Sequence, residues 1–315
     1  MTYVTGGSIQ ALDYNTFATL SASMNEVYAD LHPGATALPD AGYGYGQLPA
    51  LTSVTAGNPV LASEWTDLFQ TMRRCGGHQG TTVVPPLPVG DPSIGDLIEA
   101  FNTPSSMATL VSTLIANRFN LAPAQSTLIV GTSYAQPAGA KPWTNTLTWD
   151  YQVDFSSWNY ARYFFNSGGY LALNGSYSPV ATPEDTQWSA MLTAMSPLIF
   201  NYNSTTPNTG SGGTSLGFYN LTTSYQQVYY KTYGSGYYYS GSSITVFAKL
   251  NAAAGTNGLV DFRIVLTDAD VTPNSKTTTT TYRVDNLKAT GSNIVYPGPA
   301  VVVSTVGANS GFTAT

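Results

Sequence analysis

The sequence is poor in charge, in cysteine and in histidine, and it has no long apolar run. Lys, Arg, Asp and Glu make up 9% of its 315 residues, against about 25% in an average soluble domain. Its 11 Lys and Arg residues are spread thinly in a chain of net charge −6, so no basic stripe can neutralise a run of phosphates. No apolar run approaches the length of a membrane span. These absences exclude nucleic acid and a membrane from the expected partners.

The scarcity of cysteine and histidine limits the chemistry open to the chain. One cysteine, Cys75, excludes an intramolecular disulfide framework and a metal site built from cysteines alone. His78 lies three residues after Cys75, but a zinc site needs two further ligands, and His32 is the one other nitrogen or sulfur donor of this kind. We therefore expect no metal, and we expect His78 to bond a backbone group at a helix end.

Motifs of catalytic sites are missing as well. No Gly-x-Ser-x-Gly turn lies between a strand and a helix, and no glycine loop has the spacing that binds phosphate. The acidic residues are scattered, whereas a glycan-cleaving enzyme, the alternative from this class, needs two carboxylates in one cleft. We expect a protein that is not an enzyme and that carries no cofactor.

Low charge also indicates assembly. A monomer normally stays in solution through mixed surface charge, so this composition predicts that copies of the chain or other subunits cover much of its surface. A secreted β-protein, which can share the composition, is the alternative. Residues 1–7 lack the positive and apolar segments of a secretory signal, which predicts synthesis in a cytoplasm.

Apolar periodicity predicts an α+β protein whose residues 1–125 form a helical docking region with Gly- and Pro-rich loops. Ser63 is the expected N-cap of the second helix, and Gly76-Gly77 is its expected end. The segment from Ile9 to Phe17 resembles the segment from Val60 to Leu68, as a short internal duplication or by chance. The predicted helical faces are Tyr14–Tyr28, Trp65–Cys75 and Met107–Phe119.

Residues 126–315 are predicted to form an antiparallel β-sandwich, jelly-roll-like in arrangement, because segments rich in Val, Ile, Thr and Tyr alternate with Gly, Asn and Pro. A helix near 185–196 is expected to cross a sheet, and residues 201–217 are expected to be a flexible loop. The predicted strands are 146–155, 162–165, 170–176, 226–230, 243–250, 259–266, 277–284 and 300–305.

The segment Ala161–Gly169 places four bulky side chains in a row before a double glycine. We interpret it as a strand with partners on both faces, since such a run does not alternate between core and solvent. Phe164 and Phe165 would then pack between the sheet and the crossing helix, and Arg162 would pair with an acid or a carbonyl. The predicted core aromatics are Trp65, Trp158, Tyr163, Phe164, Phe165 and Trp188.

Tyrosines flanked by glycines are the predicted contact residues. A tyrosine presents an apolar ring and a polar tip, which suits both subunit interfaces and stacking on sugars. Packing on β-strands is the alternative for Tyr237, Tyr238 and Tyr239. The predicted interface residues are Tyr43, Tyr45, Tyr237, Tyr238 and Tyr239.

Several distinctive segments fall within residues 7–200. They are Asp13-Tyr14-Asn15, Gly42-Tyr43-Gly44-Tyr45-Gly46-Gln47, Trp65 through Cys75 to His78-Gln79 and Gly80, Ala161-Arg162-Tyr163-Phe164-Phe165-Asn166-Ser167-Gly168-Gly169, and Trp188. Together they resemble virion structural proteins of tailed bacteriophages, especially of cyanobacterial phages.

The resemblance implies a structural component of a virion without naming its place. We expect a subunit that is assembled in the host cytoplasm and located in the tail, baseplate, fibre or neck. Its implied partners are copies of itself, in a trimer or a hexameric ring, and other virion proteins. The alternative is a tail module that binds host-surface carbohydrate through exposed aromatic residues.

Overall fold

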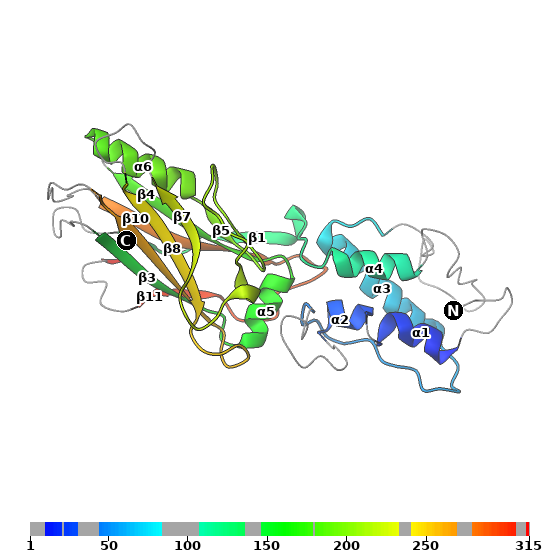
Figure 1. Ribbon diagram of the computed structural model, residues 1–315. Helices are drawn as coiled ribbons and strands as arrows, with labels where there is room; N and C mark the ends of the chain where they lie inside the picture. The colour runs from blue at the N-terminus through cyan, green and yellow to red at the C-terminus, as the bar shows by residue number, and fades with distance from the viewer. Residues whose placement is uncertain are drawn as a thin grey trace. The chain divides into compact units, whose positions relative to one another are not determined.

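The computed structural model has the predicted α+β class, with helices first and two antiparallel sheets after them (Figure 1). It describes residues 10–20, 22–30, 44–83, 107–135, 146–178, 180–232, 241–269, 279–306 and 313–314.

The chain forms two compact units, which we call the helical unit and the β unit. The helical unit comprises Met1–Thr127, Arg162–Gly168 and Lys288–Pro297; the β unit comprises Leu128–Ala161, Gly169–Leu287 and Gly298–Thr315. The predicted division at residue 125/126 therefore lacked the two later segments of the helical unit.

Where one helix was predicted from Tyr14 to Tyr28, the helical unit has two, α1 (Ala11–Ala18) and α2 (Met24–Tyr28). The N–H groups of Thr19 and Leu20 both bond the Asn15 carbonyl, which closes α1. Thr and Ser side chains compete for backbone hydrogen bonds, which favours a break between the two helices. Both helices nevertheless bury the predicted apolar face.

The helix α3 (Ala62–Gln79) runs past both of its predicted ends. Its N-cap is Leu61, where Ser63 was predicted, and the N–H of Leu61 bonds the Glu64 carboxylate at 2.7 Å. Gly76-Gly77 lies inside the helix because these glycines leave room for close neighbours; a Cβ on Gly76 would collide with Val83. The helix ends at Gly80, whose left-handed φ of 69° suits glycine.

The remaining helix of this core is α4 (Met107–Ala116), which confirms most of the third predicted face. Figure 1 shows α1, α2, α3 and α4 gathered together, with α3 beside α4. Their apolar faces make one core, which also contains Ile294 from the segment Lys288–Pro297. No helix among the described residues is long and apolar enough to cross a membrane.

The predicted strand 162–165 is wrong, because these residues belong to α5 (Trp158–Asn166). Ala161, Phe164 and Phe165 are fully buried, at the spacing of three and four that makes one side of a helix. Four bulky residues in a row thus fit a helix as well as a strand buried on two faces. The helix ends at Asn166, and the turn after it contains Gly168, where φ is +79° and a Cβ would collide with Leu121.

The β unit contains two antiparallel sheets, and seven of the eight predicted strands are confirmed within a few residues. One sheet has the order β12-β2-β10-β4-β5-β6, with β1 also paired to β10; the other has the order β11-β3-β9-β8-β7. Residues 277–278 of the predicted strand 277–284 lie outside the described residues. The strands are β1 (Ser126–Ile129), β2 (Ser133–Ala135), β3 (Thr146–Asp154), β4 (Tyr170–Ser178), β5 (Leu198–Phe200), β6 (Thr205–Thr206), β7 (Gln226–Thr232), β8 (Ser243–Leu250), β9 (Leu259–Thr267), β10 (Thr279–Ala289), β11 (Val302–Thr305) and β12 (Thr313–Ala314).

The two sheets pack face to face as a sandwich. Trp149 on β3 meets Tyr282 on β10 with ring centroids 4.2 Å apart, and Phe200 on β5 meets Phe262 on β9 at 5.1 Å. Strand β3 alternates buried and partly exposed side chains along its length, which is the pattern of a strand with one face on a core. The core of the β unit therefore lies between the sheets.

The predicted crossing helix is confirmed as α6 (Pro183–Met195), which packs on β4 (Figure 1). Thr182 caps it by accepting a hydrogen bond from the Asp185 N–H at 3.1 Å, and Asp185 bonds back to the Thr182 N–H at 2.9 Å. This reciprocal pair is a capping box. Trp188 and Leu192 are buried on the sheet side of the helix.

The prediction of a flexible loop at 201–217 is wrong. Thr205 and Thr214 form an antiparallel bridge with two backbone hydrogen bonds of 2.9 and 3.0 Å. The Asn201 side chain accepts bonds from the N–H groups of Asn203 and Ser204. Asn, Ser and Thr side chains bond locally to the backbone, so a polar composition here produced a fixed turn.

Candidate functional site

The segment Arg162–Gly168 is bound into the helical unit by polar contacts. The guanidinium of Arg162 bonds both carboxylate oxygens of Asp30, at 2.7 and 3.1 Å. Both side chains are less than one tenth exposed. Asp30 also accepts a bond from the Gly44 N–H, and the Asn166 amide donates to the Gly44 carbonyl at 2.9 Å. Arg162 thus pairs with an acid, as predicted, but from a helix and for a structural purpose.

Tyr45, a predicted interface residue, is fully buried, which contradicts a surface role. Its hydroxyl donates to the Arg118 carbonyl at 2.7 Å and accepts from the Gln79 amide at 2.8 Å. Burial raises the pKa of this phenol well above its ordinary value. Because this hydroxyl makes its hydrogen bonds within the chain and the ring is buried, Tyr45 presents no surface to a partner. Tyr43, Tyr237, Tyr238 and Tyr239 lie outside the described residues.

His78 lies inside α3, not after it, and makes the predicted bond to a backbone group. Its Nε2 is 3.1 Å from the Ser167 carbonyl oxygen, and its ring packs edge-on against Tyr45. Burial lowers the pKa of His78 to about 4, so the neutral ring donates Nε2–H to that carbonyl. Burial also raises the pKa of the Cys75 thiol. Both groups are structural, and His32 lies outside the described residues.

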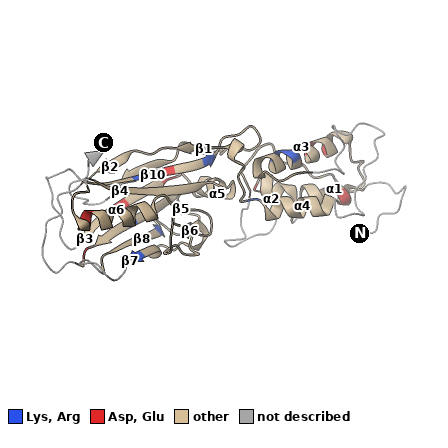
Figure 2. Ribbon diagram, turned by 90° about the horizontal axis from the view of Figure 1, so that it is seen from above, with Lys and Arg blue, Asp and Glu red and all other residues tan. Residues whose placement is uncertain are grey.

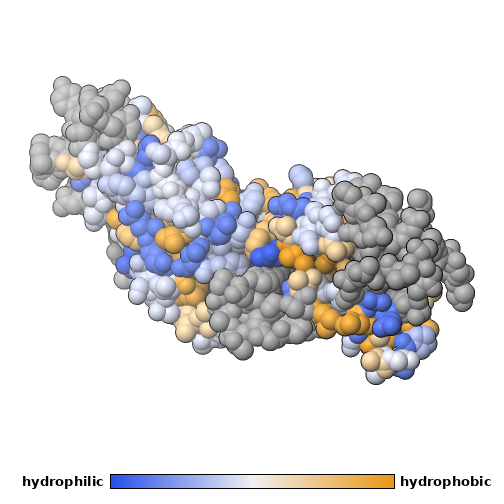
Figure 3. All heavy atoms as spheres, turned by 45° about the vertical axis from the view of Figure 1, so that its right-hand side comes forward, coloured by the Kyte–Doolittle hydropathy of each residue, from blue (hydrophilic) through white to orange (hydrophobic). Residues whose placement is uncertain are grey.

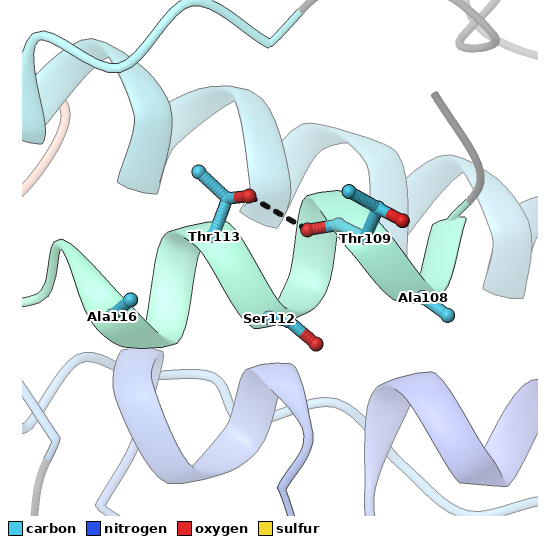
Figure 4. Close-up of a pocket in the computed structure, with 5 residues that line it drawn as sticks. All are labelled: Ala108, Thr109, Ser112, Thr113 and Ala116. Atoms are coloured by element: carbon cyan, nitrogen blue, oxygen red, sulfur yellow. Dashed lines mark hydrogen bonds between the residues drawn. The ribbon is translucent and has the colours of Figure 1, made fainter. Parts of the chain in front are cut away.

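The described part of the chain contains no group of three His, Cys, Asp or Glu residues that could hold a metal ion. A shallow depression of about 430 Å³ lies along one side of α4 (Figure 4). The Thr113 hydroxyl donates to the Thr109 carbonyl, so it is used within the helix. No charged side chain lines the depression, which offers no chemistry for a reaction. Its lining is Ala108, Thr109, Ser112, Thr113 and Ala116.

Four of the six predicted core aromatics, Trp65, Phe164, Phe165 and Trp188, are buried to 2% exposure or less. Trp158 and Tyr163 are only half-buried. The predicted position of Phe164 and Phe165 between the sheet and the crossing helix is wrong. Phe164 packs edge-on against Phe165 at 5.0 Å and against Tyr296 at 5.9 Å, all within the helical unit.

Exposed apolar residues gather in two places. Leu128, Ile129 and Val130 are 49%, 36% and 61% exposed along and just after β1. Leu48 is 81% exposed, and its neighbour Gln47 makes two hydrogen bonds to the backbone of Val295, which is also exposed. Figure 3 shows hydrophobic patches between hydrophilic ones on one face of the molecule, and Figure 2 shows how sparse charged residues are along the ribbon.

A cluster of charged and polar side chains stands on the outer face of the five-stranded sheet, the face turned away from the sandwich core. Gln152, Asp261 and Lys249 lie side by side on β3, β9 and β8, and Asp150 is paired with Arg263 in the next row. Tyr225 directly precedes β7, which is the neighbour of β8. We call this group the Tyr225 cluster: Asp150, Gln152, Tyr225, Lys249, Asn251, Asp261 and Arg263.

Ion pairs hold the Tyr225 cluster together. Arg263 makes two bonds to the Asp150 carboxylate, at 2.7 and 3.0 Å. Lys249 Nζ lies 3.5 Å from Asp261, whose two oxygens accept amide bonds of 3.0 Å from Gln152 and Asn251. The hydrogen bond to Asp150 raises the pKa of Arg263. These contacts fix four charges in a chain that has few.

The ring of Tyr225 lies against both cations of its cluster. Lys249 Nζ is 4.9 Å and the Arg263 guanidinium carbon 4.5 Å from the ring centroid. Partial burial, with a further contribution from nearby Asp150, raises the pKa of this phenol, against the opposing effect of Arg263. Sequence analysis did not find this cluster because its members come from three separate strands and from positions beside β7 and β8, and they carry no local motif.

Comparison with known proteins adds no relative: no family model, no curated protein and no solved structure matches the chain.

Proposed function

We propose that this chain is a non-enzymatic structural subunit of a tailed-phage virion, in the tail, baseplate, fibre or neck. It acts by packing against copies of itself, in a trimer or hexameric ring, and against other virion proteins. The resemblance of its distinctive segments to phage structural proteins suggests the particle, and its low charge supports a chain with much covered surface.

The observation that carries the assembly part of the proposal is the exposed apolar run Leu128-Ile129-Val130. Successive side chains of a strand point to opposite faces, so both faces of β1 present apolar groups to solvent. Within the described residues, β1 pairs with β10 alone, which leaves its other edge without a strand. An open apolar edge is an aggregation hazard in a free monomer, and a subunit contact removes it.

Immunogold labelling of intact and disrupted particles tests the proposal. An antibody against this chain should place gold at the tail, its tip or the neck. Protein found in the lysate, with no gold on intact or on disrupted particles, would remove the structural role.

Host-surface carbohydrate binding is the second candidate function. The Tyr225 cluster favours it, because a tyrosine ring can stack on a sugar and the fixed polar groups beside it can bond hydroxyls. The tyrosines from which the sequence predicted such binding do not belong to this cluster.

A further inference from the structure

We infer that the Tyr225 cluster, on the outer face of the five-stranded sheet, binds a neutral saccharide chain. The inference rests on the second candidate function, carbohydrate binding, whose site and ligand class it names, and it does not depend on the structural role in a particle. It stands on the ring of Tyr225, the hydrogen-bonding groups around it, and the balance of charge among them.

The ring of Tyr225 provides a platform for stacking. Lys249 and Arg263 reach it from the outer face of two neighbouring strands, β8 and β9, and so hold it over the sheet. Tyr225 keeps part of its surface exposed. The C–H face of a pyranose is apolar and gains free energy when it covers an aromatic face.

The side chains next to the ring offer both donors and acceptors. A guanidinium has five N–H donors, and Arg263 directs two bonds to Asp150. Gln152 donates its amide to Asp261, so its carbonyl can accept from a hydroxyl. Sugar hydroxyls both donate and accept hydrogen bonds. They therefore match a mixed set of donors and acceptors better than a ligand that only donates or only accepts.

The charges of the cluster favour an uncharged ligand. Arg263 is paired with Asp150, and Lys249 lies beside Asp261, so two cations and two carboxylates cancel. An anionic ligand would meet the carboxylates, and a cationic one would meet the ammonium and guanidinium groups. A neutral ligand leaves both pairs in place and meets no uncompensated charge at the cluster.

The polar groups are ordered before any ligand arrives. The side chains of Asp261 and Asp150 are 6% and 15% exposed, and those of Lys249 and Arg263 are 25% and 41% exposed. Cross-strand pairing fixes their spacing on the sheet. A site assembled by folding loses little side-chain entropy on binding, which is what a weak ligand such as a sugar requires.

Titration of the purified chain with maltohexaose, cellohexaose and chitohexaose, followed by NMR and by a printed array of neutral glycans, tests the inference. We expect at least one neutral probe to bind, with a Kd of ~1 mM or tighter. Covering about 60 Å² of the Tyr225 ring corresponds to about a tenfold change in Kd. Tyr225→Ala should therefore weaken binding about tenfold, whereas Tyr225→Phe should keep it.

Two further variants separate the site from the sheet in general. Gln152→Ala removes one polar partner and should weaken binding severalfold. Tyr230→Ala, the matched control, removes an exposed tyrosine of the same sheet outside the cluster and should leave Kd unchanged. Thermal melting establishes that each variant is folded. If Tyr225→Ala does not fold, the two single variants Tyr225→Phe and Gln152→Ala decide the question.

The inference is overturned if no neutral probe binds, or if binding is indifferent to Tyr225→Ala and Gln152→Ala. Tighter binding of hexagalacturonate than of the neutral probes would overturn the assignment of a neutral ligand. Loss of self-association in Tyr225→Ala, without saccharide binding, would make the cluster a subunit contact instead. Because the assay uses the purified chain, a negative result leaves the proposed place in a particle untouched.

Discussion

Phe165→Ala should strongly destabilise the helical unit. The Phe165 side chain is fully buried on α5 and packs edge-on against Phe164, with ring centroids 5.0 Å apart. Truncation of a buried phenylalanine to alanine loses the transfer free energy of the removed atoms and leaves a cavity, at about 3–5 kcal/mol. The edge-on contact with Phe164 accounts for about 1 kcal/mol of this cost.

Calorimetry and urea unfolding measure this effect. For a unit of about 150 residues, a loss of 1 kcal/mol lowers Tm by roughly 2–4 °C, so Phe165→Ala should lower it by roughly 6–20 °C. Tyr163→Ala is the matched control: it removes an aromatic ring from the same helix at a half-buried position and should cost less than about 2 kcal/mol. Equal melting of Phe165→Ala and wild type would refute the assignment of this residue to a packed core.

Three other predictions concern polar contacts and assembly. Arg162→Ala leaves Asp30 buried without its cation and should cost about 3–5 kcal/mol in urea unfolding; a double-mutant cycle with Asp30→Asn should recover part of that loss, and additive costs would contradict the pair. The pKa of His78 is about 4 in the folded chain against 6.5 for the free side chain, so the unfolded state binds the extra proton first. The contribution of His78 to the free energy of unfolding is therefore full above pH 6.5 and falls by about 3 kcal/mol as the pH falls toward 4. His78→Gln should flatten the dependence of stability on pH in this range. An unchanged slope would contradict a buried neutral histidine. Ile129→Lys puts a charge on the exposed edge of β1 and should reduce self-association in sedimentation velocity, whereas Val180→Lys, at another exposed apolar residue, should not; equal behaviour of the two would argue against the β1 contact.

The strands and α6 were predictable because their signals are local. Alternation of apolar and polar residues marks β3, and β8 was predicted with the same bounds that it has. The residues around Thr182 carry a helix N-cap within four positions. Such patterns lie within one stretch of chain, so they do not depend on contacts with the rest of the protein.

The short strands were missed for a physical reason. β5 and β6 have three and two residues, too few for a period to show, and they depend on their neighbours: β5 pairs with β4, and β6 pairs with β5. β1 and β2 likewise depend on β10. Propensity in strands is mostly a matter of such neighbours.

The sequence by itself determined the α+β class, most of the long strands, the capped helix α6, and a surface with little charge. Tertiary structure decided where the segment from Arg162 to Gly168 belongs: its partner Asp30 lies 132 positions earlier, and that ion pair ties a helix from the middle of the chain to the helical unit. It also decided that Tyr45 is buried and that three strands, β3, β8 and β9, bring their polar residues to Tyr225. Contacts between distant segments leave no local pattern, because the energy that favours them exists only once the chain has folded.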